Sequence, residues 1–118
     1  MTLEEVSGED LHGVRVLRAH GELDVVTTRA LLGDPAALTG GGPLVLDLSA
    51  ATFLDSAGVR LVDRLARECA QSGGYFRVVA PPGSRARRVL EVVGLAGALA
   101  SDDLPAAVAQ VREGTKGG

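Results

Sequence analysis

Hydrophobic residues in this chain fall into short runs with two different spacings, one typical of strands and the other of helices. Runs rich in valine, leucine and other apolar residues predict strands at 14–19, 44–48 and 75–80, with a weaker first strand at 2–7. In the run at 44–48 four residues of five are apolar, which is typical of a strand covered on both faces. A short last strand is expected at 98–100.

Apolar positions three and four residues apart predict helices between these strands. A helix is expected at 25–38, where Asp24 stands in the capping position. The last helix is expected at 104–112, behind Asp102 and Asp103, either of which could cap it.

The two most regular helical patterns lie in the second half of the chain. The pattern at 57–72 is amphipathic and ends at Gly73. Its apolar face is formed by Leu61, Val62, Leu65, Ala66 and Cys69. A second amphipathic helix is predicted at 84–93, with Gly94 as its C-terminal cap. This helix is expected to bury Ala86, Val89, Leu90 and Val93.

The alternation of strands and helices predicts an α/β (α+β) fold, in which a single mixed β-sheet of four to five strands has about four helices packed on it. The length of 118 residues is near the commonest domain size. We therefore expect one domain at 1–113 and a flexible C-terminal tail at 114–118.

Composition narrows the classes of function. The formal net charge of −3 argues against a nucleic-acid partner, because binding to phosphates needs a basic surface. The single cysteine excludes an internal disulfide. The chain has only two histidines, which are too few ligands for a metal site. The sequence start does not resemble a signal peptide, and no apolar stretch reaches the roughly 20 residues of a membrane span. These features predict a cytoplasmic protein with no membrane partner, no metal and no other cofactor.

The segment 46–59 carries the candidate chemistry. A buried strand leaves the sheet, and a short loop delivers Asp55 and Ser56 to the first turn of the next helix. Ser56 is expected to be exposed there, beside backbone N–H groups that lack a partner within the helix and would hold a phosphate. Ala57 and Gly58 add no bulk that would block an approaching active site. The simpler interpretation is that Asp55 or Ser56 is only an N-cap worth about 1 kcal/mol, and the spacing alone leaves both open.

A serine hydrolase is the main enzyme alternative. It would combine the nucleophile Ser56 with Asp24 or Asp55 and with His12 or His20. The nucleophile motif Gly-x-Ser-x-Gly is absent, since leucine and glycine occupy the two flanking positions. We therefore predict that the protein is not an enzyme and has no catalytic residue.

Three further features have simpler structural interpretations. The glycines at 40–42 lack the following lysine and hydroxyl residue that a phosphate-binding P-loop needs. Arg85, Arg87 and Arg88 could touch a nucleotide, but a solvated helix face or the rim of a protein interface explains them as well. Cys69 lies on the apolar side of its helix and is expected to be inert packing.

Short motifs spread along the chain carry a resemblance to a known family. They are Gly-Glu-Leu-Asp at 21–24, Asp-Leu-Ser at 47–49 with Asp-Ser-Ala-Gly at 55–58, and Ser-Arg-Ala-Arg-Arg-Val-Leu at 84–90 with Gly-Leu at 94–95. In this order and spacing, the chain resembles the STAS domain of sulfate transporters and anti-sigma factor antagonists over about residues 3–112.

The resemblance implies an anti-sigma factor antagonist. In that family an anti-sigma factor with serine kinase activity phosphorylates the serine that corresponds to Ser56, and a serine phosphatase is a further expected partner. The unmodified antagonist binds the anti-sigma factor and frees a sigma factor, whereas the phosphorylated form does not bind. The implied partner-binding residues are Asp24, Asp55, Ser56, Ala57, Gly58 and Arg60.

Electrostatics is consistent with such a switch. A phosphate adds about −1.5 to −2 charges beside Asp55, and about 2.8 kcal/mol is enough to weaken binding about 100-fold. Arg60 stands where many family members carry a small residue, so it could pair with the phosphate, select the partner or simply be solvated. The alternative function is a non-switching STAS scaffold, or a subunit of a stress-signalling or lipid-transport complex.

Overall fold

The computed structural model of the chain describes residues 2–23, 42–71 and 74–117. In chain order, the elements are β1 (Thr2–Val6), the 3-10 turn η1 (Glu9–Leu11), β2 (Arg15–Leu23), β3 (Leu44–Asp47), β4 (Ala51–Leu54), α3 (Ser56–Gln71), β5 (Phe76–Val79), α4 (Arg85–Val92), α5 (Ala96–Leu99), β6 (Ala100–Ser101) and α6 (Leu104–Gly117). The helix predicted at 25–38, its expected cap Asp24, most of the glycine loop at 40–42 and Gly73 lie outside the described residues.

The strands form the single mixed sheet that the sequence predicts, with one strand more than expected among the described elements. Its order is β1-β2-β3-β5-β6, with β4 paired to β2 outside this path. β1 runs antiparallel to β2, and every other pair is parallel. Because the parallel strands end at the same edge, the turns that follow β4 and β5 lie at that edge.

The extra strand is β4, which the sequence interpretation assigned to a loop. The first half of β2 pairs with β3, from Arg15 opposite Leu44 to Arg18 opposite Asp47. The second half of β2 pairs with β4, and Glu22 lies opposite Phe53. The sequence pattern does not predict this strand, because its two central residues are exposed and it pairs with β2, which is distant in the sequence.

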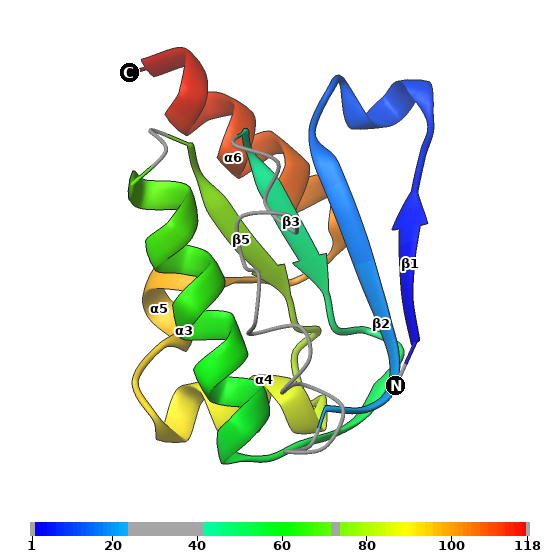
Figure 1. Cartoon of the computed structure of the whole chain (residues 1–118), viewed down its shortest axis with the longest axis vertical. Helices are drawn as coiled ribbons and strands as arrows, with labels where there is room; N and C mark the ends of the chain where they lie inside the picture. The colour runs from blue at the N-terminus through cyan, green and yellow to red at the C-terminus, as the bar shows by residue number, and fades with distance from the viewer. Residues whose placement is uncertain (1, 24–41, 72–73, 118) are drawn as a thin grey trace.

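Helices cover the two faces of the sheet, with α3 in front and α6 behind in Figure 1. The strand β3 is buried at every position, as its apolar run predicts. Leu44 and Leu46 pack in the core cluster with α3 and α4, whereas Val45 packs in the cluster with α6. The parallel centre of the sheet is therefore covered on both sides.

The amphipathic patterns correctly place α3 and α4, with one error in the predicted core. Leu90 is fully buried, but Val93 is 47% exposed. The chain leaves the helix at Gly94, whose φ is 81°, and the N–H of Leu95 donates to the carbonyl of Leu90 at 2.9 Å. This turn directs Leu95 toward the core and leaves Val93 at the surface.

The C-terminal elements differ from the prediction in their boundaries. Part of the strand expected at 98–100 belongs to the short helix α5, so β6 begins only at Ala100. The helix α6 continues past Arg112 to Gly117. Its predicted cap is confirmed for Asp103, whose carboxylate accepts the N–H of Ala106 at 2.8 Å.

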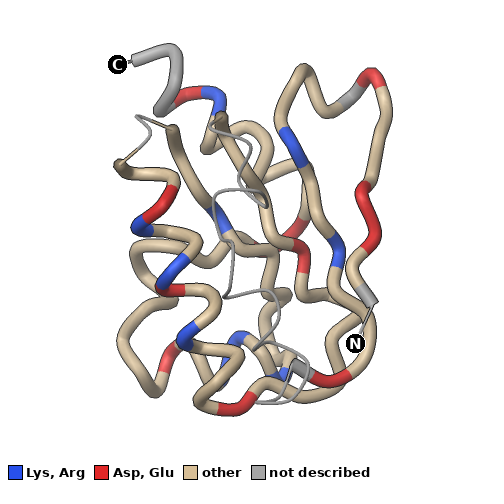
Figure 2. Tube along the Cα trace, in the orientation of Figure 1, with Lys and Arg blue, Asp and Glu red and all other residues tan. Residues whose placement is uncertain are grey.

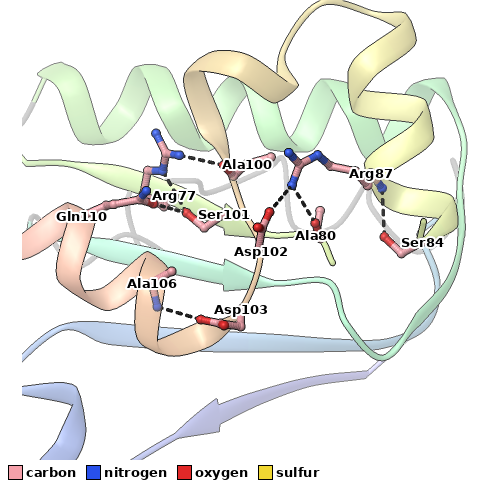
Figure 3. Close-up of polar contacts among 10 residues, drawn as sticks. All are labelled: Arg77, Ala80, Ser84, Arg87, Ala100, Ser101, Asp102, Asp103, Ala106 and Gln110. Atoms are coloured by element: carbon pink, nitrogen blue, oxygen red, sulfur yellow. Dashed lines mark hydrogen bonds and ion pairs between the residues drawn. The ribbon is translucent and has the colours of Figure 1, made fainter. Parts of the chain in front are cut away.

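Two arginines form hydrogen bonds that link β6 to β5 and α4 to the ends of these strands (Figure 3). Arg77 on β5 donates to the Ser101 hydroxyl and to the carbonyls of Ala98 and Ala100. Arg87 on α4 donates to the carbonyl of Ala80 and to Asp102. The interpretation of the arginine cluster as solvated is therefore wrong for Arg87, although Arg85 and Arg88 are exposed.

Candidate functional site

The candidate site is the junction between β4 and α3. Asp55 follows the last residue of β4, and one of its carboxylate oxygens accepts the N–H groups of Ala57 at 2.9 Å and Gly58 at 3.1 Å. Its carbonyl accepts the first intrahelical hydrogen bond, from the N–H of Val59 at 3.0 Å. Asp55 is therefore the N-cap of α3.

Ser56 is the first residue of α3 and is exposed, as the sequence predicts. Its hydroxyl forms no hydrogen bond with any residue that the structure describes. The capping interpretation therefore applies to Asp55 and not to Ser56. Ser56 is therefore an exposed residue whose hydroxyl has no structural task among these residues.

The cap at Asp55 limits one electrostatic expectation for this site. The sequence suggests that the first N–H groups of the helix are available to a phosphate on Ser56. Two of them are occupied, because the amides of Ala57 and Gly58 already donate to Asp55. A phosphate at this position would have to compete with a carboxylate for those donors.

The remaining predicted residues have different surroundings. Ala57 and Gly58 are buried against the core, whereas Arg60 is exposed one turn beyond Ser56. Asp24, which the resemblance places near the serine, lies outside the described residues.

The residues of the hydrolase alternative are engaged elsewhere. Nε2 of His20 lies 3.3 Å from the carboxylate of Glu4 on β1. His12 is exposed at the end of η1, and the carboxylate of Asp55 serves the amides of α3. Nothing described here pairs a histidine with Ser56, and residues 2–23, 42–71 and 74–117 hold no cluster of three or more metal-ligating side chains.

A buried carboxylate that the sequence analysis assigned no role holds the turn leading into this site. Asp47 is 2% exposed and accepts the guanidinium of Arg18 at 2.9 Å and the N–H of Ser49 at 2.9 Å. Its single polar position in an apolar run is the signal that could have indicated it. The pair links β2 to β3 immediately before the chain turns toward β4.

Most of these elements match a known domain family. The family model of the STAS domain matches residues 6–104, which include β3, β4, α3 and the junction with Ser56. This chain belongs to the STAS domain family. The sequence resemblance is thereby confirmed, together with the fold class that it implies.

Individual STAS proteins are similar over most of the chain. The anti-sigma-F factor antagonist RsfB of Mycobacterium tuberculosis is 38% identical over 92 residues, which are 76% of this chain and 74% of that protein. A crystal structure of an anti-sigma factor antagonist from Mycobacterium paratuberculosis is 30% identical, with a TM-score of 0.76 over 94% of this chain and 93% of that one.

The fold is also that of the Bacillus cell fate determinant SpoIIAA in its phosphorylated form. That structure has a TM-score of 0.63 and 23% identity, over 87% of this chain and 92% of that one. In the part of this STAS domain that is described, no helix has the length and apolar character needed to cross a membrane.

Proposed function

We propose that this STAS domain is an anti-sigma factor antagonist, a regulatory binding protein and not an enzyme. Two similar mycobacterial proteins carry that description, and one of them matches over nearly its whole length. The observation that carries the proposal is the exposed hydroxyl of Ser56 on the first residue of α3, beside a separate cap at Asp55.

The proposed switch is the phosphorylation of Ser56 by the anti-sigma factor, acting as a serine kinase. The γ-phosphoryl group of ATP is transferred to Oγ, the hydroxyl proton is lost and ADP is released. A serine phosphatase hydrolyses the ester and restores the hydroxyl. The unmodified form binds the anti-sigma factor, so that a sigma factor is released.

Local charge supports release after modification. A phosphate adds about −1.5 to −2 charges, next to the carboxylate of Asp55, which is held in place by two amides. A partner surface that fits a neutral hydroxyl would then face a dianion. Because the Ser56 hydroxyl forms no hydrogen bond with a described residue, its modification uses up no bond that the hydroxyl supplies to the helix.

The proposed docking surface is centred on Ser56 and includes Asp55 and Arg60. Ala57 and Gly58 belong to it by position, and their burial limits their role to keeping the start of α3 close to the sheet. Asp24 is included by resemblance.

The experiment is incubation of the full chain with its anti-sigma factor and ATP, followed by intact-mass measurement. We expect one phosphate on the wild type and none on Ser56→Ala. Ser49→Ala is the matched control, because Ser49 is an exposed serine in the same segment, and it should be labelled like the wild type. Labelling that persists in Ser56→Ala would disprove the site, and a protein that binds without being labelled would be a non-switching scaffold.

A further inference from the structure

Arg60 and Arg64 follow Ser56 along the exposed side of α3. Residues four apart on a helix are neighbours on its surface, so these three side chains form one ridge. All three are exposed, whereas Leu61 and Leu65 point into the core. Figure 2 shows basic and acidic positions in succession along this helix.

The arginines of α3 differ in whether they have a partner. Arg67 pairs with Asp63 at 3.0 Å, one turn before it. Arg60 and Arg64 form no ion pair with a residue in the described ranges. Arg60 is therefore a cation within one turn of Ser56 that has no other task among the described residues.

A phosphate on Ser56 would find two of the first amides of this helix already occupied. A helix N-terminus ordinarily supplies free amides to a phosphate, but here Asp55 holds the amides of Ala57 and Gly58. The same carboxylate adds a negative charge one residue away. A guanidinium can compensate, because its planar fork donates two hydrogen bonds to one phosphate.

We propose that Arg60 is the intramolecular partner of the phosphate on Ser56. This inference rests on the proposed function, which supplies the phosphate. In the unmodified protein the guanidinium is part of the docking surface, and in the modified protein it binds the phosphate. Phosphorylation then changes the surface twice, since it adds a dianion and withdraws a cation that a bound protein would have contacted.

The test is a titration of the phosphate by phosphorus NMR. Phosphoserine is inserted at position 56 of the full chain during translation, so that no kinase is required. A guanidinium favours the dianion and lowers the second phosphate pKa. We expect Arg60→Gln to raise that pKa by about 0.2 to 0.4 unit, the size of an exposed pair one turn apart. Arg64→Gln is the matched control and should leave the pKa within about 0.1 unit.

Two results would overturn the pairing. One is an unchanged phosphate pKa in Arg60→Gln, and the other is an equal shift in Arg64→Gln, which would indicate a general field and not a pair. Because both arginines are exposed, we expect both variants to fold like the wild type. Thermal melting checks this. Failure of the kinase to label Ser56 would count against the proposed function alone, because this titration does not depend on it.

Discussion

The N–H of Ala57 donates to the carboxylate of Asp55 at 2.9 Å, so the residue that caps α3 is the one before the exposed serine. Asp55→Ala removes this bond and the one from Gly58. We expect the free energy of unfolding to fall by about 1 kcal/mol, as for other lost caps. Urea denaturation measures the change.

Ser56→Ala is the control for the cap. The hydroxyl of Ser56 in the wild type forms no hydrogen bond with a described residue. The free energy of unfolding of the variant should therefore stay within about 0.5 kcal/mol of the wild type. A loss of unfolding free energy as large as that of Asp55→Ala would assign the cap to Ser56. It would also weaken the proposal that the Ser56 hydroxyl is free to accept a phosphate.

The ion pair of Arg18 and Asp47 predicts an asymmetry between two substitutions. Arg18→Met leaves a carboxylate that is 2% exposed without its cation, which should cost about 2 kcal/mol of the free energy of unfolding. Asp47→Asn keeps an acceptor for the N–H of Ser49, and the Arg18 side chain, 31% exposed, can turn toward water. This change should cost about 1 kcal/mol. Urea denaturation in which Asp47→Asn proves the more damaging would contradict the burial argument.

Two glycines near α4 should respond to alanine in opposite directions. Gly94 has a φ of 81°, and a Cβ there would meet nothing within 4 Å, so Gly94→Ala should lose about 1 kcal/mol of stability from backbone strain alone. Gly97 lies within α5 with equal space around it and no positive φ. Gly97→Ala should gain about 0.5 kcal/mol. Thermal melting of both variants tests the turn, and two changes of the same sign would contradict it.

Burial, with a smaller contribution from Glu68, raises the pKa of the Cys69 thiol from 9.0 to about 11. At pH 8 the folded protein should therefore react with iodoacetamide about 100-fold more slowly than the same protein in urea. Because the folded state holds this proton more tightly, stability from this group is complete below pH 9 and is lost as the pH rises toward 11. Cys69→Ala should lack this part of the pH dependence. Equal labelling rates in the folded and unfolded protein would show that the thiol is not buried.

Local sequence patterns correctly predicted the elements whose own residues show a clear apolar pattern. The spacing of Leu61, Leu65 and Cys69 located α3, and the apolar run at 44–48 indicated a strand covered on both sides. The exposure of Ser56 followed from its place between a buried strand and a helix. These features depend on neighbours a few residues away, which the sequence shows directly.

Features that depend on distant partners were missed. The strand β4 exists because it pairs with the second half of β2, and its own residues show no alternation of buried and exposed positions. The position of Val93 depends on the turn at Gly94. The amides bound by Asp55 could be assigned only from coordinates, since an aspartate followed by a serine permits either residue as the cap.

The pairing of β4 with β2 has a consequence for the docking that we propose at Ser56. The strand ends at Leu54, two residues before the serine, and the helix begins at the serine itself, so regular backbone structure flanks this position on both sides. Docking therefore loses little conformational entropy at this point. Under the proposed switch, both forms of Ser56 share one backbone frame, and a partner distinguishes them by the chemistry of two side chains, Ser56 and Arg60.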